Sequence, residues 1–184
     1  DVGIKALAIH GRTRTQMYKG QADWELIGKV KSNPRINIPI FGNGDIDSPG
    51  KALEYKNKYG VDGIMIGRAA IGYPWIFNEI KHYLQTGEYL PAPTIEDRVA
   101  VCKKHLHKSF EWKGPKVGIY EMRRHYTNYL KGLPGIKDYR LKLVTLNTVE
   151  EIDEVLDEIK NKYAGFEFIK TPIELINYHE KCPV

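Results

Sequence analysis

Three short apolar runs alternate with helical spacing in the first half of this 184-residue chain. The runs cover residues 4–9, 38–41 and 63–66, and runs of this length and composition are typical of buried parallel strands. Strands that alternate with helices predict the βα units of a parallel sheet or barrel.

The residues around the predicted helices support this reading. Asp23 and Ser48 are residue types that cap a helix N-terminus, and Gly60 and Gly87 are placed to end a helix. Residues 1–90 therefore hold about three βα units, whereas a (β/α)8 barrel needs eight units in about 250 residues. We expect a chain that begins in the middle of a fold, with the earlier units upstream.

The pattern becomes wholly helical after the Pro-Ala-Pro segment 91–93, which we predict to be a stiff domain linker. Apolar residues at three-to-four spacing predict four helices, at about 95–110, 117–130, 136–144 and 147–163. Together they predict a small helical bundle. The expected organisation is α/β plus all-α: a partial barrel at 1–90, a helical domain at 94–163 and a tail at 164–184.

Two glycine-rich turns follow the second and third predicted strands, at residues 41–46 and 64–70. Glycine lets a backbone come close to a ligand, and amides at the start of a helix suit a phosphate. Arg68 adds a guanidinium that can bind phosphate through two hydrogen bonds. In (β/α)8 barrels the loops after the last two strands form the usual phosphate site. Each turn alone is also compatible with an ordinary tight turn.

Charge is concentrated in the predicted helical domain, although the whole chain carries only +5. Residues 113–142 hold eight Lys or Arg and two acidic residues, interleaved with tyrosines. Basic groups beside stackable rings suit RNA, which offers phosphates and unstacked bases. A solvated helix face with tyrosines in the core is the simpler explanation for any single residue.

Other chemistry has little support in the sequence. Cys102 and Cys182 are too few and too far apart for a disulfide framework or a zinc site. His105 and His107 would point to different faces of a helix, so we predict no metal site. No apolar run reaches the ~20 residues that a membrane span requires, which favours a cytoplasmic protein.

Several motifs resemble one known family. His10-Gly-Arg-Thr-Arg14, the turn at 42–46, Met65-Ile-Gly-Arg-Ala-Ala70 and Pro74-Trp-Ile-Phe77 occur in the order and spacing of tRNA-dihydrouridine synthases. The segment 121–135 resembles their C-terminal domain, and most of all that of the bacterial B-type branch. The resemblance covers residues 4–160.

The resemblance implies an FMN-dependent (β/α)8 barrel with a helical tRNA-binding domain, which reduces a tRNA uridine to dihydrouridine with NADPH as the reductant. His10 would lie beside the flavin, and Arg12 would face a uridine flipped out of the tRNA. The implied cofactor-binding residues are His10, Asn43, Gly44, Asp45, Gly67 and Arg68. The implied tRNA-binding residues are Arg12, Arg14, Arg123, Arg124, His125, Lys131 and Arg140.

The family's general acid is a cysteine in an earlier barrel loop, and neither Cys102 nor Cys182 matches that motif. We therefore expect a C-terminal fragment that holds no catalytic residue and binds FMN weakly or not at all. We also expect it either to self-associate through its exposed barrel half or to rearrange so that helices cover the sheet. Two alternatives remain open. The chain could be an RNA-binding module with a non-catalytic barrel remnant, or another FMN barrel, such as a relative of dihydroorotate dehydrogenase.

Overall fold

The computed structural model describes residues 3–168. These residues form two compact units. The first holds residues 3–70 and 74–90, and the second holds 71–73 and 91–168. The short segment 71–73 thus belongs with the residues beyond 91, and the Asn128 side chain donates to the Ile71 carbonyl at 2.8 Å.

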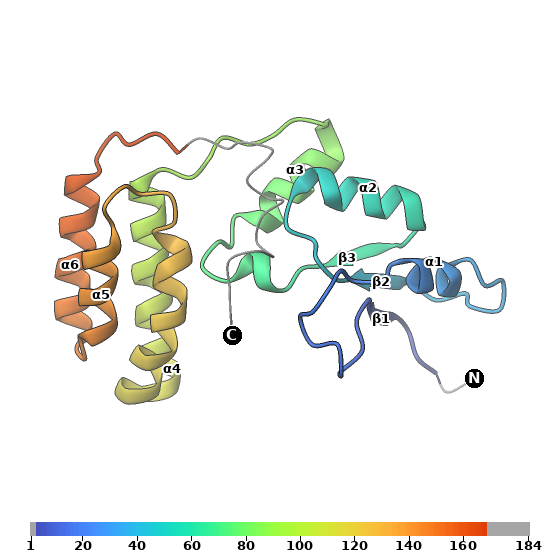
Figure 1. Ribbon diagram of the computed structural model, residues 1–184, viewed down its shortest axis with the longest axis horizontal. Coiled ribbons are helices and arrows are strands. Elements are labelled where there is room, and N and C mark those ends of the chain that lie inside the picture. Colours follow the sequence, from blue (N-terminus) through green and yellow to red (C-terminus); the bar gives the residue numbers. More distant parts are fainter. Residues whose placement is uncertain (1–2, 169–184) are drawn as a thin grey trace. The chain divides into compact units, whose positions relative to one another are not determined.

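The first unit is built on a three-stranded parallel sheet in the order β1 (Leu7–His10), β2 (Ile40–Asn43), β3 (Gly63–Met65) (Figure 1). The predicted succession of three parallel strands is confirmed. Strand boundaries differ from the prediction because pairing, rather than apolar character, decides them. Asn43 pairs with both neighbours, His10 and Met65, so residues predicted to form a turn lie inside β2.

Three helices belong to this unit: α1 (Glu25–Lys31), α2 (Pro49–Tyr59) and α3 (Ile76–Thr86), with a 3-10 turn at Arg68–Ala70. Their ends follow the predicted capping residues. The Ser48 hydroxyl accepts from the Lys51 amide at 3.4 Å, and Gly60 and Gly87 adopt φ of 64° and 75°. Asp23 accepts from the Glu25 amide at 2.9 Å, although α1 itself begins one residue later than predicted.

Trp24 forms the centre of the core beneath the sheet. Only 2% of the residue is exposed, and its ring lies 5.0 Å from that of Tyr55 and 5.7 Å from that of Tyr59. A Cβ on Gly42 would lie 2.2 Å from the Trp24 ring, so a strand glycine is required for this close approach. On the other face of β2, Phe41 is 39% exposed.

The second unit contains α4 (Ile95–Tyr129), α5 (Lys137–Thr145) and α6 (Val149–Lys162), which pack on one another (Figure 1). Gly114, at φ 78° and ψ 172°, breaks α4 into two limbs that we call limb 1 (95–113) and limb 2 (115–129). The two separate helices predicted here are therefore confirmed. The limbs run antiparallel, since contacts join Ser109 to Gly118, His105 to His125 and Arg98 to Tyr129 in succession.

The core of this second unit consists of fully buried side chains from all three helices: Cys102, Leu106, Met122, Tyr126, Leu143, Ile152, Leu156 and Ile159. A capping box at Thr94 and Asp97 begins limb 1, and Thr148 caps α6. Phe166 to Phe168 have no regular structure, and the rest of the predicted tail lies outside the described residues. Within residues 3–168, no helix is long and apolar enough to cross a membrane.

Candidate functional site

The carboxyl edge of the sheet gathers the residues predicted for cofactor binding. His10 ends β1, Asn43 ends β2, and Gly67 and Arg68 follow β3. His10 Nδ1 lies 3.2 Å from the Asn43 carbonyl, so a proton on Nδ1 would leave Nε2 as an acceptor. The Asn43 amide donates to the Met65 carbonyl at 3.2 Å. Both polar side chains are thereby tied to the ends of neighbouring strands.

An ionic cluster of Arg12, Asp45 and Arg68 lies in the loops above this edge. Two Arg12 nitrogens donate to the two Asp45 oxygens at 2.6 and 2.7 Å, and Arg68 donates to the same carboxylate at 2.7 Å. The Arg12 and Asp45 side chains are only 1% and 6% exposed, whereas that of Arg68 is 39% exposed. Arg12 and Asp45 are therefore the buried members of the cluster, and Arg68 is its accessible cation.

Asp45 is held in its charged form. Burial alone would raise its pKa, but hydrogen bonds from Arg12 and the Ala22 amide, and the charges of Arg12 and Arg68, outweigh it, and the pKa lies below its ordinary value. Asp45 adopts φ of 54°, a left-handed conformation that Asp tolerates better than most residues. One carboxylate thus neutralises the buried arginine and fixes the direction of the exposed one.

Gly44 and Gly67, one in each turn, differ in whether the structure requires glycine at their position. Gly44 adopts φ of 141°, and a Cβ there would lie 2.5 Å from that of Ala22. At Gly67, by contrast, a Cβ would meet no described atom within 4 Å, and the backbone has no positive φ. Packing and backbone conformation therefore do not require glycine at 67. What it leaves is open space over the backbone at the residue before Arg68.

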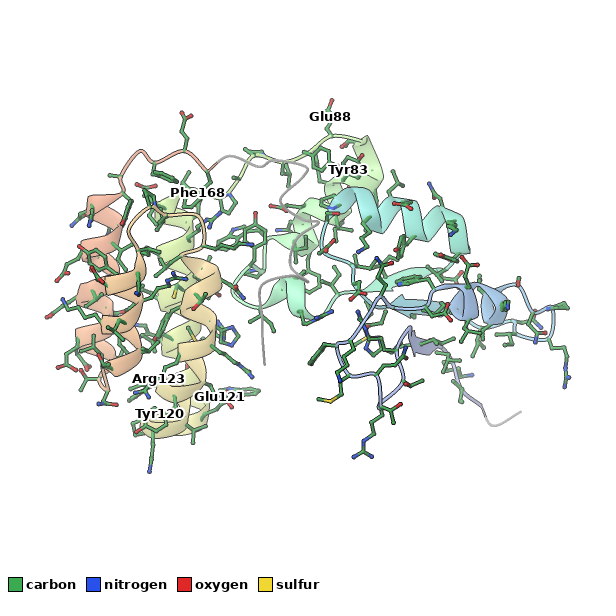
Figure 2. All side chains as sticks on the ribbon, in the orientation of Figure 1. Tyr83, Glu88, Tyr120, Glu121, Arg123 and Phe168 are labelled. Carbon is green, nitrogen blue, oxygen red and sulfur yellow. The ribbon has the colours of Figure 1, made fainter. Side chains whose placement is uncertain are left out.

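The residues predicted to bind tRNA are not all equally available. Arg123 donates to the Leu146 carbonyl and to Asn147 at 3.4 and 3.1 Å and stacks on Tyr120, so it joins limb 2 to the loop before α6. Arg124 is exposed, and its Nε donates to His125 at 3.3 Å. Figure 2 shows Tyr120 and Arg123 side by side near the turn of α4.

The remaining predicted tRNA contacts are distributed over both units. Arg14 and Lys131 are exposed, and Arg140 is half-buried. Arg12, in contrast, is buried against Asp45, so its predicted contact with a uridine stays a prediction that requires the guanidinium to leave this ion pair.

Sequence reasoning missed several parts of the site. The Trp24 indole donates to the Gly44 carbonyl at 2.9 Å, and the Gly20 carbonyl accepts from Arg12. The Tyr18 ring lies 4.7 Å from the Arg68 guanidinium. A strand glycine at 42 signals the close approach of a large side chain, but nothing local identifies Trp24 as that side chain.

Cys102 is a core residue, whereas His105 is half-buried and His107 is exposed. Cys102 is fully buried, and burial, followed by the charge of Asp153, raises the pKa of its thiol. His107 contacts Asp153 at 2.7 Å, whereas His105 lies against His125. Residues 3–168 contain no cluster of His, Cys, Asp or Glu that could hold a metal ion. Cys182 lies outside the described residues.

Parallel strands that alternate with helices, with glycine turns at their carboxyl edge, place the first unit in the α/β class. The family is more specific than this class. Residues 1–164 match the family model described as Dihydrouridine synthase (Dus), and the chain belongs to this family. The resemblance found in the motifs is thereby confirmed.

Three curated relatives show the extent of the similarity. The chain is 41% identical over 162 residues to tRNA-dihydrouridine synthase B of Pseudomonas aeruginosa, covering 88% of this chain and 47% of the relative. It is 42% identical to a probable tRNA-dihydrouridine synthase of Rickettsia bellii, over 89% of this chain and 48% of the relative. It is 39% identical to a probable tRNA-dihydrouridine synthase 1 of Synechocystis, over 86% of this chain and 44% of the relative. The chain spans about half the length of the curated relatives it matches.

Proposed function

We propose that the protein to which this chain belongs reduces a uridine of tRNA to dihydrouridine, with FMN as cofactor and NADPH as reductant. The observation that carries the proposal is the family match over residues 1–164, together with relatives that are named tRNA-dihydrouridine synthases. This family assignment gives no support to the alternative of a different FMN barrel. We further propose that the first unit is part of a (β/α)8 barrel and that the second unit, with α4–α6, is the tRNA-binding domain.

The residues at the carboxyl edge fit the phosphate end of FMN. Open space over Gly67 lets an oxyanion reach the backbone, and Arg68 presents a partly exposed guanidinium whose direction Asp45 fixes. Asn43, with its amide held by Met65, offers further polar contact at the same edge. Bound FMN would supply the hydride chemistry, and the role of these side chains is to bind and orient it.

Asp45 supports this site indirectly in our proposal. A carboxylate repels a phosphate, so Asp45 is suited to hold Arg68 rather than to contact the ligand itself. Arg12 completes the arrangement by balancing the charge of Asp45 from the buried side. His10, exposed at the end of β1, is placed to contact a group bound above the sheet.

Arg68→Ala is expected to weaken FMN binding by roughly 10- to 150-fold, because a hydrogen bond to a charged group contributes about 1.5–3 kcal/mol. Because this chain alone is expected to bind FMN weakly, titration of FMN fluorescence against the full product of the gene that encodes it measures this loss. Lys51→Ala, which removes a cation from a surface pair with Asp47, serves as the control and should leave the affinity unchanged. If neither the parent protein nor the variant binds FMN, the non-catalytic RNA-binding module becomes the better explanation.

Arg124→Glu is expected to weaken tRNA binding and to reduce its dependence on salt. Loss of one phosphate contact lowers the slope of log affinity against log salt by about 0.7–0.9. Arg124 is chosen because no carboxylate pairs with it among the described residues, whereas Arg123→Glu would also break the contacts to Leu146 and Asn147.

A filter-binding series at several salt concentrations with unmodified tRNA measures both quantities. Lys29→Glu on α1 is a matched charge reversal of an exposed cation away from the predicted contacts, and we expect little loss of affinity from it. If Arg124→Glu leaves the tRNA affinity and its salt dependence unchanged, Arg124 lies on a solvated helix face and does not contact tRNA.

A further inference from the structure

A pocket of about 450 Å³ opens between the two limbs of α4, and its lining includes Arg124 and His125, which the sequence predicted to contact tRNA. Limb 1 contributes His105 and Trp112, and limb 2 contributes Arg124 and His125. The volume falls within the range of roughly 300–1,000 Å³ typical of small-ligand sites. All of its lining residues belong to the same compact unit.

Trp112 is the most unusual residue of this pocket. It is 87% exposed, although a tryptophan normally gains a great deal from burial. Within residues 3–168, no ring or cation stacks on it. Packing in the helical unit therefore does not explain why a large aromatic ring lies at this position. A free ring at the rim of a pocket is suited to stack on a flat ligand.

The charge around the pocket favours an anionic ligand. Lys113 pairs with Glu121, and Lys108 pairs with Glu111 at 2.6 Å. Arg124 forms no ion pair within residues 3–168, and its Nε donates to the His125 ring; Glu121, which is paired with Lys113, acts on Arg124 only through its charge. The pocket thus combines an aromatic surface with a cation that is available for a phosphate.

Two imidazoles form the polar wall of the pocket. The His105 and His125 rings lie 4.6 Å apart, and His105 Nδ1 lies 3.2 Å from the Tyr129 hydroxyl. Burial, then the charges of His105 and Arg124, lower the pKa of His125 to about 4. Burial, followed by the charge of Lys113, lowers the pKa of His105 as well. Both rings are therefore neutral at neutral pH, and one nitrogen of each is already engaged, with the Tyr129 hydroxyl and with Arg124 Nε respectively.

We propose that this pocket binds one unpaired nucleotide of an RNA, with the base stacked on Trp112 and its phosphate bound by Arg124. The proposal rests on the proposed tRNA-modifying function, and it concerns a nucleotide held by α4 itself, apart from the proposed FMN contacts at the carboxyl edge of the sheet. Unstacked bases of single strands and loops are recognised by this combination of aromatic rings and cations. Trp and Arg are also common in protein interfaces, but the excess of basic residues over residues 113–142 suits a polyanion, so we favour RNA.

The test is the affinity of Trp112→Ala for unmodified tRNA and for a short oligouridine. Stacking of one base contributes about 1–3 kcal/mol, so we expect affinity to fall by roughly 5- to 150-fold. The salt dependence should stay unchanged, because stacking involves no phosphate. Trp112→Phe should retain most of the affinity. Phe77→Ala removes an exposed ring of α3 and is the matched control, for which we expect no change.

Tryptophan fluorescence provides a second readout. Oligouridine should quench the emission of the exposed Trp112 and should fail to do so in Trp112→Phe, where only Trp24 and Trp75 remain. If Trp112→Ala is correctly folded by circular dichroism and binds tRNA as tightly as the parent protein, the nucleotide pocket is wrong while tRNA binding stands. If the parent protein binds no tRNA at all, the proposed RNA function fails together with the pocket. Binding of a protein partner in a Trp112-dependent way, without RNA binding, would also overturn the proposal.

Discussion

Replacement of Asp45 by alanine should lower the free energy of unfolding by about 3–5 kcal/mol, because it leaves the Arg12 guanidinium buried without a counter-charge. The Asp45 carboxylate accepts hydrogen bonds from Arg12, from the Ala22 amide and from Arg68, and all three donors lose this partner together. Urea unfolding followed by far-UV circular dichroism measures the change.

Two further variants separate the ion pair from other effects at Asp45. Asp45→Asn keeps the shape and tolerates the left-handed backbone, so its cost reports mainly the lost charge. Glu25→Ala breaks the exposed pair with Lys58 and should leave the unfolding midpoint essentially unchanged. Equal effects of Asp45→Ala and Glu25→Ala would contradict the buried role of this carboxylate.

The same ion pair predicts an acid dependence with a definite sign. The pKa of Asp45 is lower in the folded state, so its contribution to stability is complete above its unfolded pKa of about 3.9. That contribution is lost as the pH falls through the folded pKa. The stability difference between the parent protein and Asp45→Asn should therefore be constant near neutral pH and should shrink in acid below about pH 4.

Trp24→Ala is expected to cost about 3–5 kcal/mol of stability, as is usual for removal of a large aromatic ring from a packed core. Its indole fills the space over Gly42 and donates to the Gly44 carbonyl, so the loss should reach the turn that precedes Asp45. We therefore expect weaker FMN binding even at a temperature where the variant remains folded.

Trp24→Phe distinguishes ring packing from the indole hydrogen bond. It keeps most of the ring but cannot donate to Gly44, and we expect an intermediate loss of stability. Phe77→Ala, an exposed aromatic on α3 of the same unit, should change stability much less. A Trp24→Ala protein as stable as Phe77→Ala would show that the core is not organised around this ring.

Much of the fold was predictable because its signals are local. Ser48, Gly60 and Gly87 cap their helices as expected, and the Gly114-Pro115 pair separates the two limbs of α4. Strand ends were less accurate, since hydrogen bonding between strands carries β2 on through Asn43. Because the neighbouring strands decide where β2 ends, the sequence of β2 alone does not predict its last residue.

The candidate site was only partly predictable for the same physical reason. The glycine turns and Arg68 carry a sequence signal, but Arg12 and Asp45 lie 33 residues apart, and no periodicity relates them. The pocket in α4 combines Trp112 and His125 from two limbs, so it exists only after the helix reverses at Gly114. Motifs therefore identify the residues, and the fold decides which of them remain accessible to a ligand.

The most direct test of the proposed function is the formation of dihydrouridine itself. The product of the gene that encodes this chain would be incubated with FMN, NADPH and tRNA transcribed without modifications, and the digested tRNA would be analysed by mass spectrometry. We predict dihydrouridine that appears only when NADPH is present and that decreases in the Arg68→Ala variant. A protein that binds FMN and tRNA but forms no dihydrouridine in any tRNA would contradict the assignment of tRNA uridine as the substrate.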